Sequence, residues 1–112
     1  MERSLQSSPF LEKVYGPEER TELARKRGRR FIESAAAAFA AKEAFSKALG
    51  TGVRGFALSD VQLLHDGLGA PFLRLTGRAA ALAAEKGLRF TVSVTHTDAY
   101  AAAVVIGYTL NV

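Results

Sequence analysis

Several features that commonly reveal a protein's chemistry are missing from this sequence. The 112 residues include no cysteine, which excludes disulfide bonds and thiolate metal sites. No apolar run approaches the ~20 residues that a membrane-spanning helix needs, and residues 1–10 contain no signal-peptide apolar core. We therefore expect a single cytoplasmic domain over residues 1–112, with a modest core and no membrane partner.

Common catalytic motifs are also absent. The segment GTGVRG, residues 50–55, lacks the lysine and hydroxyl residue of a Walker phosphate loop. No G-x-S-x-G sequence supports a serine nucleophile, although a Ser-His-Asp triad stays open. His65 and His96 lie on separate predicted elements without an evident third ligand, so zinc is a weak prediction.

Positive charge is concentrated in one short segment. The formal net charge is +4, and residues 25–30, RKRGRR, hold five basic side chains and one glycine. Such a run attracts an anionic partner, which could be nucleic acid, a phosphate group or an acidic protein. A solvated, positively charged helix junction explains the same run equally well.

The first half of the sequence predicts helices. Ser8 and Pro9 suit the N-cap and first position of a short helix. A second helix is predicted over residues 17–26, with glutamates in its first turn and basic residues in its last. A longer helix over residues 30–49 ends at Gly50, a favourable residue just after a helix.

The long helix has apolar residues on two sides, which indicates a central helix. One predicted stripe consists of Phe31, Ala35, Ala38, Phe45 and Leu49. The other consists of Ile32, Ala36 and Phe39, and Glu43 is its next position. We therefore expect Glu43 to be partly buried.

The second half of the sequence predicts antiparallel strands. Residues 60–64 and 71–75 flank a glycine-containing turn and form a hairpin. A short helix follows over residues 77–86. Residues 89–96 alternate between apolar and polar side chains, and the apolar residues 100–109 predict a buried strand. Helices followed by antiparallel strands give an α+β class.

Glu43 and the lysines around it are the first candidates for chemistry. Glu43 and Lys47 are spaced for an ion pair along the helix, which contributes about 0.3–0.5 kcal/mol when exposed. The alternative is a site for Mg²⁺ and phosphate, because Mg²⁺ prefers oxygen ligands from carboxylates, phosphates and water. Lys42 and Lys47 would then hold phosphate oxygens.

The two histidines lead to different predictions. His96 ends the apolar face of its strand, so it is either a core histidine or a ring that meets a ligand. His65 lies in the polar hairpin loop and is predicted to be an ordinary surface residue.

Four segments, taken in order, resemble one family. They are FLEKVYGPEERTEL at 10–23, FAAKEAFSKALGTG at 39–52, HDGLGAPFLRLTGRAAALA at 65–83 and VSVTHTDAYAAAVVI at 92–106. They resemble the early helices, signature helix, hairpin and closing strands of the holo-acyl-carrier-protein synthases, which are small phosphopantetheinyl transferases. The matching signature residues are Phe39, Lys42, Glu43, Ala44, Lys47, Leu49, Gly50, Ser93, His96, Tyr100 and Ala101.

The resemblance implies a reaction and roles for residues. A carrier-protein serine attacks the β-phosphate of coenzyme A, receives the phosphopantetheine arm and so supports fatty acid biosynthesis. Glu43 would bind Mg²⁺ and Lys47 would contact the phosphates, which makes these two the catalytic residues. The implied substrate-binding residues are Lys42, Lys47, Gly50 and His96.

The resemblance also implies an assembly and a partner. Family members of this length form trimers with each coenzyme A site between two subunits, and their partner is an acidic, helical acyl carrier protein. A net charge of +4 suits that partner. The carrier-docking surface is predicted to include Arg20, Arg25, Arg29 and Arg30.

The sequence departs from the family pattern in three places. The family begins with a strand carrying G-x-D-[ILV]-V-E-I-x-R, whose aspartate is the other metal ligand, whereas this sequence opens at MERSL. We expect that strand to be missing from residues 1–112, through a start codon assigned too late or through decay of the copy. Ala38 and Ala70 replace basic residues of the family and are expected to weaken coenzyme A binding.

Two alternative functions follow from the same features. The first is an inactive, truncated homologue that keeps the fold without turnover. The second is a small basic module that binds nucleic acid through residues 25–30, although the main interpretation includes no nucleic-acid partner.

Overall fold

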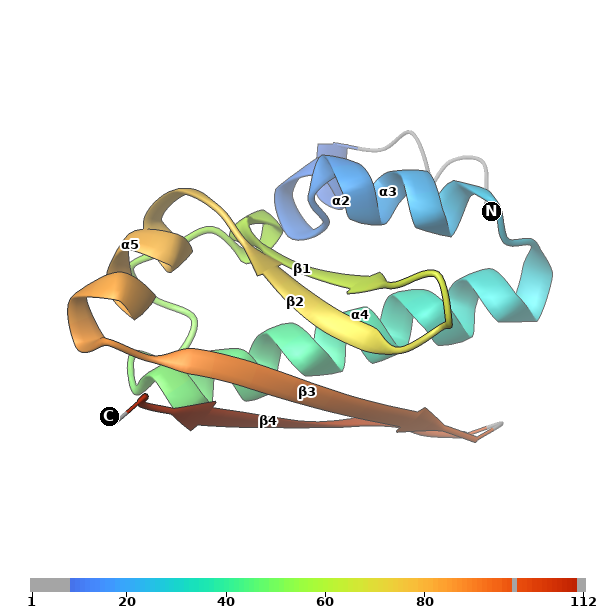
Figure 1. Ribbon diagram of the computed structural model, residues 1–112. Helices are drawn as coiled ribbons and strands as arrows, with labels where there is room; N and C mark the ends of the chain where they lie inside the picture. The colour runs from blue at the N-terminus through green and yellow to red at the C-terminus, as the bar shows by residue number, and fades with distance from the viewer. Residues whose placement is uncertain (1–8, 98, 111–112) are drawn as a thin grey trace.

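The structure is a computed structural model that describes residues 9–97 and 99–110, and it confirms the α+β class. The predicted N-cap, Ser8, lies outside the described residues. Figure 1 shows the elements in chain order. They are α2 (Pro9–Val14), α3 (Pro17–Ala24), α4 (Gly28–Leu49), the 3₁₀ turn η1 (Leu58–Asp60), β1 (Val61–His65), β2 (Pro71–Leu75), α5 (Gly77–Lys86), β3 (Arg89–His96) and β4 (Ala101–Tyr108).

The described strands form two antiparallel hairpins, β1–β2 and β3–β4, rather than one continuous sheet. Their registers pair Leu63 with Leu73 and Ser93 with Val104. The 22-residue helix α4 contacts β1, β3 and β4, and α3 covers β1 and the first part of α4 (Figure 1). The hairpin predicted around the HDGLGA turn is therefore confirmed.

The core consists of two apolar clusters along α4. The first joins α2, α3, α4 and β1 through Leu11, Val14, Tyr15, Leu23, Phe31, Ala38, Ala41 and Leu63. The second centres on Phe45, whose ring centroid lies 5.5 Å from that of Phe56 and 4.7 Å from that of Phe90. These clusters hold the hairpins against one side of α4.

Glycine ends two helices as the sequence predicts. Gly50 has φ 92° after α4 and Gly87 has φ 65° after α5, both in the left-handed region that closes a helix at low cost. Thr76 precedes α5, and its hydroxyl lies 3.4 Å from the Asp60 carboxylate. That carboxylate also accepts the Arg78 N–H at 3.2 Å, so Asp60 of η1 caps the first turn of α5.

The expectation that α4 is covered on both sides is wrong. The stripe of Phe31 is buried except for the half-buried Ala35. On the other stripe Phe39 is half-buried against the core, but Ile32 is 59% exposed, and Ala36 and Glu43 are also exposed. The described elements cover only one side of the helix, whereas a periodic pattern identifies faces without indicating which face is covered. The predicted partial burial of Glu43 is therefore also wrong.

The expectation that the last strand is fully buried is also wrong. In β4 the side chains that face α4 are half-buried, whereas Val104 and Ile106 on the opposite face are 60% and 57% exposed. Side chains alternate between the two faces of a strand, and the described chain covers only one of them. The molecule therefore presents an apolar strip along β4.

Candidate functional site

Glu43 and Lys47 lie one turn apart on α4, and both are exposed. Positions i and i+4 share one face of a helix. Throughout the described residues, no ion pair joins these two side chains, and the Glu43 carboxylate accepts no hydrogen bond. The ion-pair alternative therefore has no support from the geometry, and both groups remain available to a ligand.

Lys42 lies inside the protein. Its ammonium is 0% exposed and lies 2.6 Å from the Glu19 carboxylate, which is 1% exposed. It also donates to the main-chain oxygens of Leu58, at 3.2 Å, and Val61. These acceptors use the three hydrogens of an ammonium group. This buried position contradicts the prediction that Lys42 binds substrate, because an ammonium that is buried and already donates three hydrogen bonds cannot reach a ligand.

Glu19 joins three elements through its two carboxylate oxygens. Besides Lys42 of α4, it accepts the Leu63 N–H of β1 at 2.8 Å and the Gly16 N–H at 3.0 Å. Gln62 completes the start of α3, since its side-chain oxygen accepts the N–H groups of residues 18 and 19 at 2.9 and 3.0 Å. The first N–H groups of a helix have no partner within the helix, so β1 caps α3 from a distance.

Burial changes the proton affinities in this network. Burial raises the pKa of Glu19 and lowers the pKa of Lys42, and the ion pair opposes both changes. The Tyr15 hydroxyl donates to the Ala35 oxygen at 2.7 Å. Burial, and to a smaller extent the negative charge of the nearby Glu19 carboxylate, raises the pKa of Tyr15 to about 12. The network therefore holds the α4 turn that carries Glu43 and Lys47 firmly against β1 and α3.

His96 ends β3 and is not a core residue, because its side chain is 45% exposed. Its Nδ1 atom lies 3.7 Å from a carboxylate oxygen of Glu33 on α4, whose side chain is 20% exposed. A groove runs between α4 and the β3–β4 turn at this point. It is lined by Ile32, Glu33, Ala36, His96, Thr97, Ala99, Tyr100 and Ala101.

His65 is exposed, as predicted, but it is not isolated. Its main-chain N–H and its Nδ1 atom both lie against the Glu22 carboxylate, at 3.0 and 2.9 Å. This pair ties the end of β1 to α3, and the neighbouring surface is lined by Arg25, Lys26 and Asp66. His65 therefore has a structural partner that the hairpin sequence does not reveal.

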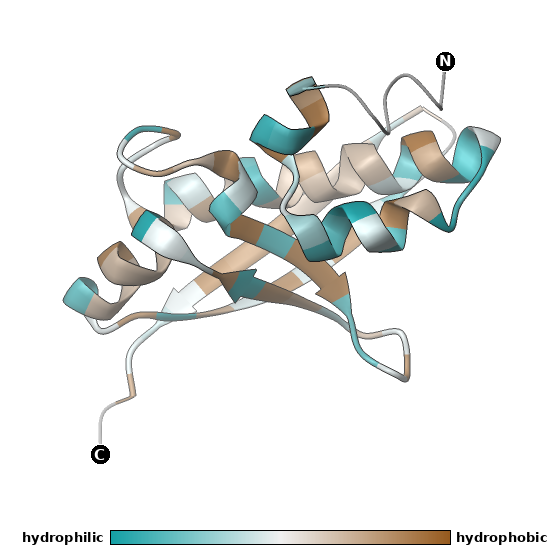
Figure 2. Cartoon of the chain, turned by 90° about the horizontal axis from the view of Figure 1, so that it is seen from above, coloured by the Kyte–Doolittle hydropathy of each residue, from teal (hydrophilic) through white to brown (hydrophobic). Residues whose placement is uncertain are grey.

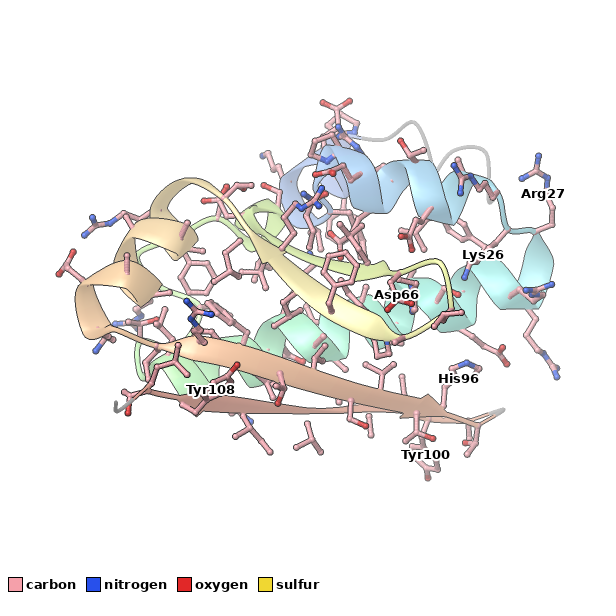
Figure 3. The ribbon with its side chains drawn as sticks, viewed as in Figure 1. Lys26, Arg27, Asp66, His96, Tyr100 and Tyr108 are labelled. Atoms are coloured by element: carbon pink, nitrogen blue, oxygen red, sulfur yellow. The ribbon has the colours of Figure 1, made fainter. Side chains whose placement is uncertain are left out.

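The basic segment lies at one end of the molecule. Figure 3 shows Lys26 and Arg27 at the same end as Asp66 and His96, whereas Tyr108 lies at the opposite end. Arg25, Arg29 and Arg30 are exposed, and Arg20 is half-buried. Arg27 donates to the Ala24 and Lys26 oxygens and so closes α3. The α3–α4 connection is strongly hydrophilic, as Figure 2 shows in teal.

Glu43 and His96 do not converge within one chain. His96 lies beside Glu33, and Glu33 and Glu43 are separated by ten positions of α4, or about 15 Å along the helix axis. A site that uses both residues therefore needs a long ligand or a second copy of the chain. Gly50 lies three residues beyond Lys47 and closes α4 through hydrogen bonds to the oxygens of residues 46 and 47.

The donors available for Mg²⁺ are limited. Within residues 9–97 and 99–110, no group of three or more histidine, aspartate or glutamate side chains is placed to hold a metal ion. Glu43 nevertheless offers an exposed carboxylate that has no other partner among the described residues, and Mg²⁺ is often held by one or two carboxylates with phosphate and water. Glu43 could therefore hold Mg²⁺ together with ligands from outside these residues.

Glu19, Gln62, Glu22 and Glu33 are the partners that sequence reasoning missed. Each meets its partner across a long separation in sequence: 23 residues between Glu19 and Lys42, for example. The only local signal was at Glu19, which stands where the third residue of a helix commonly caps the first turn.

None of the described helices is long and apolar enough to cross a membrane. The sequence model of the 4′-phosphopantetheinyl transferase superfamily matches residues 1–105 of this chain. The holo-[acyl-carrier-protein] synthase of Caldanaerobacter subterraneus subsp. tengcongensis is 42% identical over 98 residues, which cover 87% of this chain and 76% of that protein.

Solved structures agree with the sequence match. The crystal structure of holo-[acyl-carrier-protein] synthase from Neisseria meningitidis superimposes with a TM-score of 0.83 at 30% identity, over 92% of this chain and 82% of that one. The enzyme from Bacillus anthracis str. Ames, in complex with CoA (3′,5′-ADP), gives 0.77 at 29% identity, over 90% and 81%. The chain therefore belongs to the 4′-phosphopantetheinyl transferase superfamily, and within it to the holo-[acyl-carrier-protein] synthase family. The resemblance found in the motifs is confirmed.

Proposed function

We propose that this chain transfers 4′-phosphopantetheine from coenzyme A to a serine of apo acyl carrier protein, and so supplies fatty acid biosynthesis. The serine oxygen attacks the β-phosphorus, a new phosphoester bond forms, and the bond to the bridging pyrophosphate oxygen breaks. Adenosine 3′,5′-bisphosphate leaves with the electron pair of that bond, and the serine proton passes to solvent. Family membership supports the reaction, and the CoA complex of the Bacillus anthracis relative supports the donor.

The observation that carries this proposal is the exposed face of α4 with Glu43 and Lys47. An ammonium and a carboxylate stand one turn apart, and neither is neutralised by the other. Lys47 would hold phosphate oxygens, and Glu43 would hold Mg²⁺. When bound, Mg²⁺ supplies positive charge to the pyrophosphate. Catalysis of phosphoryl transfer is mainly positioning and electrostatic stabilisation, which these residues can provide.

The working form in this proposal is a homotrimer with its sites between copies. Two features support an assembly: the exposed apolar strip at Val104 and Ile106, and the separation of His96 from Glu43 within one chain. His96 of one copy would lie along the coenzyme A bound at Glu43 of the next. Gly50 would lie at the edge of that site, just after Lys47.

The carrier protein docks in this proposal on the basic end of the molecule. Arg25, Arg29 and Arg30 are exposed there, and Arg20 is half-buried on α3. Charges at the rim of an interface act mainly on the rate of encounter. Replacing Arg25 and Arg30 by glutamate should slow carrier modification and leave coenzyme A affinity nearly unchanged. An equal loss of coenzyme A affinity would place this cluster in the nucleotide site instead.

The proposal is tested by following label from coenzyme A onto a carrier-protein serine. Glu43→Gln keeps the side-chain shape but removes the charge that would hold Mg²⁺, so we expect most Mg²⁺-dependent transfer to disappear. Glu85→Gln, at an exposed position of α5, is the matched control and should retain activity. Near-full activity of Glu43→Gln would refute the assignment. An affinity for nucleic acid that Glu43→Gln does not change, and that falls steeply with salt concentration, would favour the basic-module alternative.

A further inference from the structure

The groove between α4 and the β3–β4 turn places two ionisable side chains, Glu33 and His96, beside apolar ones. Ile32 and Ala36 of α4 and Ala101 of β4 line it together with Glu33 and His96. Figure 3 shows that the His96 ring projects from the end of β3. The two polar groups come from different elements, so only the packing of β3 on α4 brings them together.

The main chain that carries His96 is well anchored. The Thr97 N–H donates to the Tyr100 oxygen at 2.7 Å, and the Thr97 hydroxyl accepts the N–H groups of Ala99 and Tyr100 at 3.3 and 3.1 Å. These bonds fix the strand end, but they leave the imidazole free to rotate about its own bonds. The ring therefore needs a side-chain partner to hold one orientation.

Glu33 is placed to be that partner. Its carboxylate lies 3.7 Å from His96 Nδ1, which is ion-pair range but longer than a hydrogen bond. Catalytic hydrogen bonds are often long in the absence of ligand and shorten when it binds. Both ring nitrogens of an imidazolium carry hydrogen, so an Nδ1–H directed at Glu33 leaves Nε2–H as the donor for a ligand.

We propose that Glu33 is a positioning residue, which orients the His96 ring so that Nε2 contacts coenzyme A. This inference rests on the proposed function, because it takes coenzyme A as the ligand of the groove. The anionic groups of coenzyme A are suited to an imidazolium held in this way, since an Nε2–H with a fixed direction donates to a phosphate oxygen at less cost in ordering. Glu33 itself does not touch the ligand.

The molecule contains its own control for this pair. It has two histidines, and the other, His65, lies 2.9 Å from Glu22 through the same Nδ1 atom but outside the groove. Glu33→Gln and Glu22→Gln therefore each remove a carboxylate charge from beside a histidine Nδ1, one inside the groove and the other outside it. In the full chain, labelled with ¹⁵N, the chemical shifts of the ring nitrogens report which of them carry hydrogen, and steady-state transfer reports kcat and KM for coenzyme A.

Glu33→Gln should shift the ring-nitrogen signals of His96 and raise KM for coenzyme A by about two- to fivefold, the range for one partly exposed charge pair, with little change in kcat. Glu22→Gln should shift the His65 signals and leave KM unchanged. A stability change without a change in KM would mean a merely structural contact and would overturn the inference. So would unchanged His96 signals. If the wild-type chain neither binds coenzyme A nor transfers its arm, the proposed function fails, and the inference falls with it.

Discussion

Replacing Glu19 by glutamine should destabilise this protein far more than an average surface change. The wild-type carboxylate accepts three donors, from Lys42, Gly16 and Leu63, whereas an amide has one acceptor oxygen and directs its own hydrogens at a donor. Lys42 would then be a buried ammonium without its counter-charge. Breaking a buried pair in this way costs about 3–5 kcal/mol.

The magnitude can be measured by urea unfolding at one fixed protein concentration. A loss of about 3–5 kcal/mol should lower the unfolding midpoint by roughly 1–5 M urea. Glu18→Gln is the matched control. This neighbouring glutamate pairs with Arg74 at the surface, where both side chains are about half exposed, and its other oxygen accepts the Gln62 amide at 2.9 Å, a bond that a glutamine oxygen can also accept. An exposed pair contributes about 0–1 kcal/mol, so this variant should unfold near the wild-type midpoint.

A double variant tests whether the unpaired Lys42 charge causes the loss of stability. Adding Lys42→Met to Glu19→Gln removes the stranded charge, and the double variant should be more stable than Glu19→Gln alone, because apolar groups can replace a buried ion pair at little cost. A cost below about 1 kcal/mol for Glu19→Gln, or strict additivity of the two changes, would refute the reasoning.

Three further predictions concern separate parts of the molecule. The pKa of Tyr15 is raised from an ordinary 10.0 to about 12, so its contribution to stability is complete below pH 10 and is lost as pH rises. The free energy of unfolding should therefore fall by up to about 1.4 kcal/mol per pH unit between about pH 10 and 12, and Tyr15→Phe should remove that dependence. Gly16→Ala should cost about 1–3 kcal/mol in urea unfolding, since its Cβ would lie 2.4 Å from a Gln62 side-chain atom. Replacing Val104 and Ile106 together by threonine should weaken self-association, seen as a lower mass by sedimentation at an unchanged circular dichroism spectrum; an unchanged mass would remove β4 from the proposed interface.

The sequence by itself determined those features whose cause is local. Gly50 and Gly87 end their helices because glycine adopts positive φ without strain, and this property does not depend on the rest of the fold. The turn residues between residues 65 and 70 gave the first hairpin, and the alternation in residues 89–96 gave the half-buried face of β3. The order and spacing of the motifs also identify the family without reference to the fold.

Only the tertiary structure decided which faces are covered and which charges meet. Periodicity placed Glu43 and Ile32 on an apolar stripe, but coverage depends on where the hairpins pack, and the described chain leaves that side of α4 exposed. The same packing gave adjacent residues opposite environments: Lys42 points into the core toward Glu19, while Glu43 faces outward. An ion partner 23 residues away in sequence is found only when α3, α4 and β1 are brought together, because charge pairing depends on distance in space and not on spacing along the chain.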